Sequence, residues 1–336
     1  MKNWEKTKIQ NDDGEIVEAI APVIISASRS TDIPAFYSKW FFNRLKQGYV
    51  VWINPFNRKA QYVSFEKTRA IVFWTKNPKP IMPYLPILDE MKIKYYFQYT
   101  LNDYEKENLE PNIPSLEKRL DTFIKLSNQI SKEKVIWRYD PLLLSDNISV
   151  DSLINRIASI GEKINQYTNK LVFSYADISC YQKVRKNLSG HTNSYREFSE
   201  DEMNLFAEKL QKINENWKLK LATCAELVEL EKFGIEHNRC VDDELIYSIG
   251  KDDKILSSWL GFENSSELTL FDNPAYSANK KLKDKGQRKE CGCVISKDIG
   301  MYNTCNHLCS YCYANHSDTT VQKNINLHNE ERQSII

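Results

Sequence analysis

Short apolar runs and amphipathic stretches alternate along most of the chain. The apolar runs are rich in β-branched and aromatic residues, as in buried strands, and the stretches between them repeat with helical spacing. This pattern predicts strands at 23–26, 70–74, 94–99, 134–139, 171–175 and 218–223, and helices at 115–129, 150–165 and 199–214. Ser199 followed by Glu202 is typical of a helix start. Two runs at 49–54 and 60–65, separated by a turn, predict a β-hairpin.

Six β–α units in series predict the fold class. Short, near-continuous apolar strands that alternate with helices favour a parallel sheet covered on both faces. We expect an α/β protein built as a partial (β/α)6 TIM-like barrel over residues 21–240. Residues 1–20 form a charged lead-in, residues 241–290 form a connecting segment, and residues 291–336 form a cysteine-rich, cluster-binding segment. We expect the polar tail of this last segment, from His316 onward, to be poorly ordered.

Polar and ionisable residues follow each predicted strand. They are Ser28 and Arg29, Thr75 to Pro78 with Lys76, Gln98 to Thr100, Arg138 to Pro141 with Asp140, Tyr175 and Asp177, and Cys224 to Glu226. In β/α barrels this rim is where ligands bind, because the loops converge there. The alternative interpretation is that these residues only mark where strands leave the core.

The cysteines are concentrated late in the chain. Seven of the eight lie after residue 223, and the polar N-terminus has no apolar signal core, so we expect a cytoplasmic protein whose thiols bind metal and do not form disulfides. Cys305, Cys309 and Cys312 have a C-x3-C-x2-C spacing, which can bind three irons of a [4Fe–4S] cubane and leave the fourth open.

The remaining cysteines leave several interpretations open. Four of them could form a second site: Cys224, Cys240, Cys291 and Cys293. The alternatives are an auxiliary [4Fe–4S] cluster, a structural zinc site, or reduced thiols packed as small hydrophobic groups. We expect Cys180 to be a buried thiol and His307 to orient the cysteine loop or face solvent.

The cysteine loop resembles the signature of radical S-adenosylmethionine (SAM) enzymes. It includes an aromatic residue, Tyr311, before the third cysteine, and its flanks resemble those of spore-photoproduct-lyase-like members. Three further motifs and the terminal cysteines resemble the family called domain of unknown function 1848 over nearly the whole chain: Ser26 to Pro34, Phe73 to Pro78, and Trp137 to Pro141. In the radical SAM superfamily the cysteine loop follows the first strand, whereas here it lies near the C-terminus. We expect the C-terminal segment to fold back over the rim.

The resemblance implies a radical SAM-type enzyme that reductively cleaves SAM and generates a 5′-deoxyadenosyl radical to act on an unidentified substrate, with nucleic acid as one candidate. It implies an electron donor such as a flavodoxin or ferredoxin, and a place for Tyr311 near the adenine. At the rim, Lys76, Arg138 and Glu226, and then Arg29, Asp32 and Asp140, are the candidates to meet the charged and hydroxyl groups of SAM. The alternative is a non-catalytic zinc- or iron–sulfur-binding module on a TIM-like barrel.

Charge and hydropathy limit the partners. Forty-six basic and forty-five acidic residues give a net charge of +1, so no global field attracts nucleic acid or anionic lipid. Any nucleic-acid contact would be local, through the basic stretch at 279–290, which is otherwise a solvated connector. No apolar run is long enough to predict a membrane span.

Overall fold

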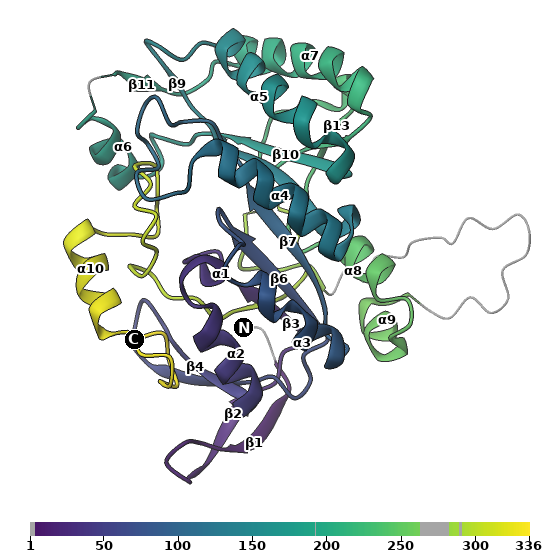
Figure 1. Ribbon diagram of the computed structural model, residues 1–336, viewed down its shortest axis with the longest axis vertical. Coiled ribbons are helices and arrows are strands. Elements are labelled where there is room, and N and C mark those ends of the chain that lie inside the picture. Colours follow the sequence, from purple (N-terminus) through teal and green to yellow (C-terminus); the bar gives the residue numbers. More distant parts are fainter. Residues whose placement is uncertain (1–3, 192, 263–281, 289–290) are drawn as a thin grey trace, which may run out of the picture.

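A parallel eight-stranded sheet forms the centre of the computed structural model, which describes residues 4–191, 193–262, 282–288 and 291–336. The strand order is β13-β12-β10-β8-β7-β6-β3-β14, and every neighbouring pair is parallel (Figure 1). The strands are β3 (Ile24–Ala27), β6 (Ala70–Thr75), β7 (Lys94–Thr100), β8 (Val135–Leu142), β10 (Lys170–Tyr175), β12 (Lys220–Thr223), β13 (Ile235–His237) and β14 (Lys297–Asp298).

One layer of helices covers one face of this sheet. Because the strands from β3 to β13 lie in chain order, right-handed crossovers place their connecting helices on the same side. These helices are α1 (Ile33–Phe36), α2 (Ser38–Gln47), α3 (Leu85–Glu90), α4 (Leu116–Ile130), α5 (Val150–Ile164) and α7 (Glu200–Trp217), while the short α6 (Gln182–Leu188) lies in the connection between β10 and α7. Phe41, Phe123 and Phe206 from this layer share one core with Phe73 and Phe173 of the sheet.

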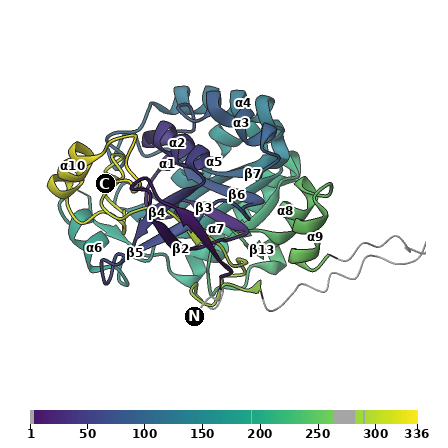
Figure 2. The same cartoon turned by 90° about the horizontal axis from the view of Figure 1, so that it is seen from below.

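Later parts of the chain cover the opposite face. There α8 (Asp243–Ile249), α9 (Lys254–Leu260) and residues 282–288 and 291–294 pack on the sheet (Figure 2). Val72 and Tyr96 of the sheet lie in one apolar cluster with Ile246, Leu256 and Val294. The part of the predicted connecting segment 241–290 that the structure describes is therefore a layer of the fold, because a singly wound sheet leaves this face to be covered by chain that follows it.

The predicted elements match the structure closely. All six predicted strands and the three predicted helices are present, and both halves of the Ser199–Glu202 capping box form. The α/β class is confirmed. Within the described residues the sheet is open, because β13 and β14 are its edges and do not pair with each other. Closure into a barrel is therefore not shown.

A second sheet has four strands, which come from the charged lead-in and from residues 49–64. The charged lead-in folds as the hairpin β1 (Lys6–Gln10) and β2 (Ile16–Ile20), which continues into β5 (Ala60–Ser64) and β4 (Tyr49–Ile53). The predicted β4–β5 hairpin is confirmed. A third, two-stranded sheet joins β9 (Leu144–Ser145) to β11 (Tyr195–Arg196).

The C-terminal tail is built into the fold. It contains α10 (Asp318–Leu327), and Figure 1 shows this helix in yellow beside the N-terminal elements. Trp40 Nε1 donates to the Arg332 carbonyl at 2.9 Å, and Val51 N donates to the Gln333 carbonyl at 2.7 Å. The expectation of a poorly ordered tail is wrong, because these backbone contacts and the buried side chain of Ile335 hold it.

Strand β14 brings the two ends of the chain together. Its residues Lys297 and Asp298 pair in parallel with Ile25 and Ser26 of β3. The Asp298 carboxylate accepts hydrogen bonds from Ser26 Oγ (2.7 Å), Ser28 Oγ (2.8 Å) and Arg29 N (2.8 Å). Gly300 follows, and a Cβ there would lie 1.8 Å from Ser28 Oγ, so only glycine permits this close approach. The cysteine loop therefore starts beside the first strand of the main sheet, as the expected return of the C-terminal segment required.

Candidate functional site

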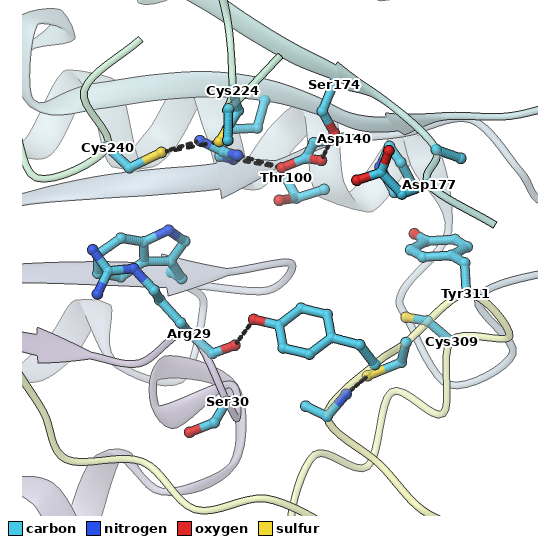
Figure 3. Close-up of a pocket in the computed structure, with 18 of the residues that line it drawn as sticks. Arg29, Ser30, Thr100, Asp140, Ser174, Asp177, Cys224, Cys240, Cys309 and Tyr311 are labelled. Atoms are coloured by element: carbon cyan, nitrogen blue, oxygen red, sulfur yellow. Dashed lines mark hydrogen bonds and ion pairs between the residues drawn. The ribbon is translucent and has the colours of Figure 1, made fainter. Parts of the chain in front are cut away.

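A pocket of about 440 Å³ lies at the carboxyl ends of the parallel strands. Polar residues from the ends of β3, β6, β8, β10 and β12 form one wall, and the C-terminal segment forms the other (Figure 3). All seven cysteines that follow residue 223 line this pocket: Cys224, Cys240, Cys291, Cys293, Cys305, Cys309 and Cys312. Figure 3 shows Cys224 and Cys240 at one end, and Cys309 with Tyr311 at the other.

Hydrogen bonds from backbone N–H groups hold the loop with Cys305, Cys309 and Cys312, both within the loop and to Leu109. Cys312 N donates to the Cys309 carbonyl at 3.0 Å, Ala314 N donates to Cys312 Sγ at 3.3 Å, and Ser310 N donates to the Leu109 carbonyl at 2.9 Å. Burial raises the pKa of the Cys305 and Cys309 thiols. The loop thus presents three thiols to one cavity.

Asp32 and His307 anchor this loop to the sheet. His307 Nε2 lies 2.7 Å from Asp32 Oδ2, and both side chains are buried. The same oxygen accepts from Lys76 N at 2.7 Å, while Asp32 Oδ1 caps α1 by accepting from Ala35 N at 2.9 Å. His307 also packs on the ring of Phe36, with centroids 4.6 Å apart. Its imidazole is thus engaged in orienting the loop.

We expect Asp32→Ala to lower the free energy of unfolding by about 3 kcal/mol, because it removes a helix cap and leaves two buried donors unpaired. Urea denaturation measures the change. Asp253→Ala is the matched control, since it removes the cap of α9 (Asp253 Oδ1 to Leu256 N, 3.0 Å) and should cost about 1 kcal/mol. Equal losses for both variants would contradict an anchoring role for Asp32.

A buried ion pair lies beneath Tyr311. Lys76 Nζ is 2.7 Å from Glu110 Oε1 and 3.0 Å from the Tyr311 hydroxyl, which itself donates to Glu110. Asn102 Nδ2 donates to the same hydroxyl at 3.0 Å. Burial raises the pKa of Glu110, but Lys76 and Arg119 outweigh it and lower the pKa overall. Lys76 and Tyr311 are therefore tied together at the cysteine-loop end of the pocket.

The other four cysteines converge from three segments. The Sγ atoms of Cys224 and Cys240 are 3.4 Å apart, and the backbone N–H groups of Cys240 and Val241 donate to Cys293 Sγ at 3.2 and 3.3 Å. Hydrogen bonds with Cys224 and Cys293, together with the charge of Arg138, lower the pKa of Cys240. A hydrogen bond from Cys293 lowers the pKa of Cys291 to about 7.

Arg138 links these cysteines to the strand ends. Its Nη1 donates to Cys240 Sγ at 3.1 Å and to Gln98 Oε1 at 3.2 Å, and its guanidinium forms an ion pair with Asp140. Asp140 in turn accepts from Ser174 Oγ. Figure 3 shows Cys240, Asp140 and Ser174 along one wall of the pocket.

Two more charged groups complete the pocket. Arg29 stacks over Trp74, with its Cζ 4.7 Å from the ring centroid, and its Nη2 is buried without a hydrogen-bond partner among the described residues. Glu226 accepts from Tyr175 N at 2.8 Å, and burial raises its pKa to about 7.

The structure brings all the predicted site residues to one pocket. Lys76 and Tyr311 lie at the cysteine-loop end, whereas Arg138 contacts the four-cysteine set. Cys180 is an exception to the expectations: it is exposed, because it lies in the loop that leaves β10. The sequence analysis did not predict Glu110, Asn102 and Asp298 as site residues. For Glu110 there was one signal: a buried Lys76 needs a carboxylate partner.

The basic stretch at 279–290 also contributes to the pocket. Residues 279–281 and 289–290 of it lie outside the described residues. Arg288 lines the pocket, where its Nη1 is 2.7 Å from Asp177 Oδ2 and its Nη2 donates to the Tyr181 hydroxyl at 3.0 Å. Lys283 and Lys285 are exposed.

The chain belongs to the family described as Domain of unknown function (DUF1848), whose model matches residues 24–314. No curated protein matches the chain. Among solved structures, it is similar to a proposed alpha-L-fucosidase from Bacteroides thetaiotaomicron, with 10% identity and a TM-score of 0.25, over 59% of this chain and 85% of that one. A likeness this slight carries no argument about function.

A search for membrane spans returned none: no helix among the described residues has both the length and the apolar character needed to cross a bilayer.

Proposed function

We propose that this protein is an iron–sulfur enzyme of the radical SAM type, with a [4Fe–4S] cluster bound by Cys305, Cys309 and Cys312. The observation that supports this most is the position of β14. The cysteine loop follows this strand, which pairs in parallel with β3 at the edge of the main sheet.

The strand order supports the relocation of the loop. Starting from β14, the sheet continues as β3, β6, β7, β8 and β10, all parallel. In the radical SAM pattern the cysteine loop follows the first strand of the series. Here the loop follows the edge strand β14, so it lies in the equivalent position in space although it comes late in the chain. We therefore extend the proposal to a partial barrel of radical SAM type.

The donor set fits a cluster with one open iron. The loop offers three thiols to the pocket, and His307 is engaged with Asp32 and so does not supply a fourth ligand. Among the described residues, no group of three or more Cys, His, Asp or Glu side chains is arranged around a metal ion. That finding concerns ligands that share one ion, whereas the thiolates of a cubane bind separate irons.

Several residues of the pocket have the charge needed to hold SAM. Lys76, with Tyr311 beside it, lies at the cysteine-loop end, and Arg138, Asp140 and Glu226 lie along the strand ends. When reduced, a bound cluster of this kind supplies the electron that cleaves SAM. A flavodoxin or ferredoxin is the class of partner that would deliver it.

Anaerobic reconstitution tests this proposal. We expect the protein to bind iron and sulfide, and after reduction to convert SAM to 5′-deoxyadenosine. The triple variant Cys305→Ala, Cys309→Ala, Cys312→Ala should lose the loop-bound iron and all turnover, because fewer than three thiolates cannot hold the cluster.

Cys180→Ala is the matched control, since this thiol is exposed and does not line the pocket. It should leave iron content and turnover unchanged. Zinc in place of iron would contradict the proposal and favour a non-catalytic zinc-binding module. Iron bound equally by the wild type and the triple variant would contradict the assignment of the loop.

A further inference from the structure

The four cysteines at the far end of the pocket come from three separate segments. Cys224 follows β12, Cys240 follows β13, and Cys291 and Cys293 lie on the segment that covers the sheet after α9. All four line the pocket, and Cys240, Cys291 and Cys293 are buried. All are free thiols.

Hydrogen-bond donors converge on two of these sulfur atoms. Cys240 Sγ accepts from Arg138 Nη1 at 3.1 Å and from Asn238 Nδ2 at 3.2 Å. Cys293 Sγ accepts from the N–H groups of Cys240 and Val241 at 3.2 and 3.3 Å. A neutral thiol is a weak acceptor, so four N–H donors aimed at two sulfurs match thiolates better than thiols.

Two guanidinium groups supply opposite charge. Arg138 is almost fully buried against Cys240, and Arg29 lines the same pocket as Cys240, Cys291 and Cys293. Arg29 Nη2 is buried and has no hydrogen-bond partner among the described residues. Since a buried N–H donor without an acceptor is costly, a negatively charged group in this end of the pocket would stabilise it.

We propose that Cys224, Cys240, Cys291 and Cys293 bind a second, auxiliary iron–sulfur cluster. Four thiolates complete the ligation of a [4Fe–4S] cluster, and N–H groups directed at its sulfur ligands are among the features that set its reduction potential. The inference does not depend on the function proposed for the loop with Cys305.

The arrangement favours a cluster over a zinc ion. A structural zinc site is closed around one tetrahedral ion, whereas all four of these cysteines line an open pocket. Cys224 is half-buried at the wall of the pocket, which leaves room for a larger group beside it. Binding would separate the Cys224 and Cys240 sulfurs, now 3.4 Å apart, because each would bind its own iron.

Iron and acid-labile sulfide measured on the anaerobically reconstituted full chain test the proposal. The double variant Cys224→Ser, Cys293→Ser should lose about half of the iron and sulfide of the wild type, as expected for one of two cubanes. The triple variant of Cys305, Cys309 and Cys312 should keep the other half. If only the triple variant loses iron, or if zinc replaces iron at the four cysteines, the proposal is wrong.

The two proposals fail separately in this experiment. Without a loop cluster, the triple variant would match the wild type while the double variant would lose all its iron. Cys180→Ser, read alongside circular dichroism, controls for thiol loss and for folding.

Arg138→Gln provides a test that keeps all four cysteines. It removes a positive charge and an N–H donor to Cys240 Sγ, so the potential of one cluster should become more negative while iron content stays constant. Redox titration followed by electron paramagnetic resonance measures this. An unchanged potential would overturn the placement of a cluster beside Arg138.

Discussion

Replacing Glu110 by glutamine is expected to lower the free energy of unfolding by about 3 kcal/mol. Glu110 is buried and is the carboxylate partner of Lys76, while Arg119 Nη1 lies 3.8 Å from its other oxygen. The neutral amide leaves Lys76 without its carboxylate partner and leaves Arg119 with only the more distant Glu105, 4.0 Å away. Removing one member of a buried pair is far more costly than removing a surface pair, because the remaining charge stays desolvated.

Urea denaturation of Glu110→Gln measures the effect, and Glu117→Gln on the exposed side of α4 is the matched control. The control should change stability by less than about 0.5 kcal/mol. A loss below about 1 kcal/mol for Glu110→Gln would show that the charge of Glu110 does not hold Lys76 and Tyr311 together.

The pH dependence of this difference has a defined sign. The folded-state pKa of Glu110 is depressed, since the attraction of Lys76 and Arg119 exceeds the cost of burial. Its contribution is therefore complete above the ordinary glutamate pKa of about 4.3 and is lost as the pH falls through the folded-state value. The stability gap between wild type and Glu110→Gln should shrink in acid, and a gap that widens would contradict this assignment.

We expect Asp298→Asn to cost about 4 kcal/mol and to loosen the cysteine loop. The Asp298 carboxylate accepts from five donors, which are Ser26 Oγ, Ser28 Oγ, Ser30 Oγ, Arg29 N and Gly300 N. An asparagine directs an NH2 group at some of these donors and leaves them unsatisfied, and each buried donor without a partner costs about 1–3 kcal/mol.

Thermal and urea denaturation measure the loss, with Asp121→Asn as the control, because Asp121 pairs with Lys125 on the exposed surface of α4. The control should change stability by about 0.5 kcal/mol or less. Asp298→Asn should also reduce iron retention in the reconstituted protein. If Asp298→Asn loses much stability but retains as much iron as the wild type, cluster binding does not depend on the pairing of β14 with β3.

Local patterns in the sequence determined the helices and strands of this protein and the position of its cysteine motif. Strands such as 94–99 and helices such as 199–214 could be predicted from the repeat of apolar residues, from β-branched residues and from the Ser199 capping box. All of these are properties of residues that are neighbours in the sequence. The C-x3-C-x2-C motif could be recognised for the same reason. Residues at strand ends could be assigned to one pocket because parallel strands all end at the same edge of a sheet.

Contacts between distant parts of the chain needed the tertiary structure. Strand β14 has only two residues, too few for a recognisable pattern of apolar positions, so the sequence does not reveal its pairing with β3. This pairing nevertheless determines where the cysteine loop lies. The cover of the sheet by α8 and α9 and the packed tail were missed for similar reasons: the apolar surfaces that they bury belong to other segments. Cys180 was expected to be buried, but the sequence does not show where a loop leaves the core.

The site shows the same division. The sequence alone identified the seven late cysteines and the ionisable residues Lys76, Arg138 and Glu226 as candidates from their type and position. Only the tertiary structure paired Lys76 with Glu110, His307 with Asp32, and Arg138 with Cys240. Residue type limits the chemistry that a side chain can perform, whereas its partners, and therefore its charge state and orientation, depend on groups that the fold brings from as far as 275 positions away.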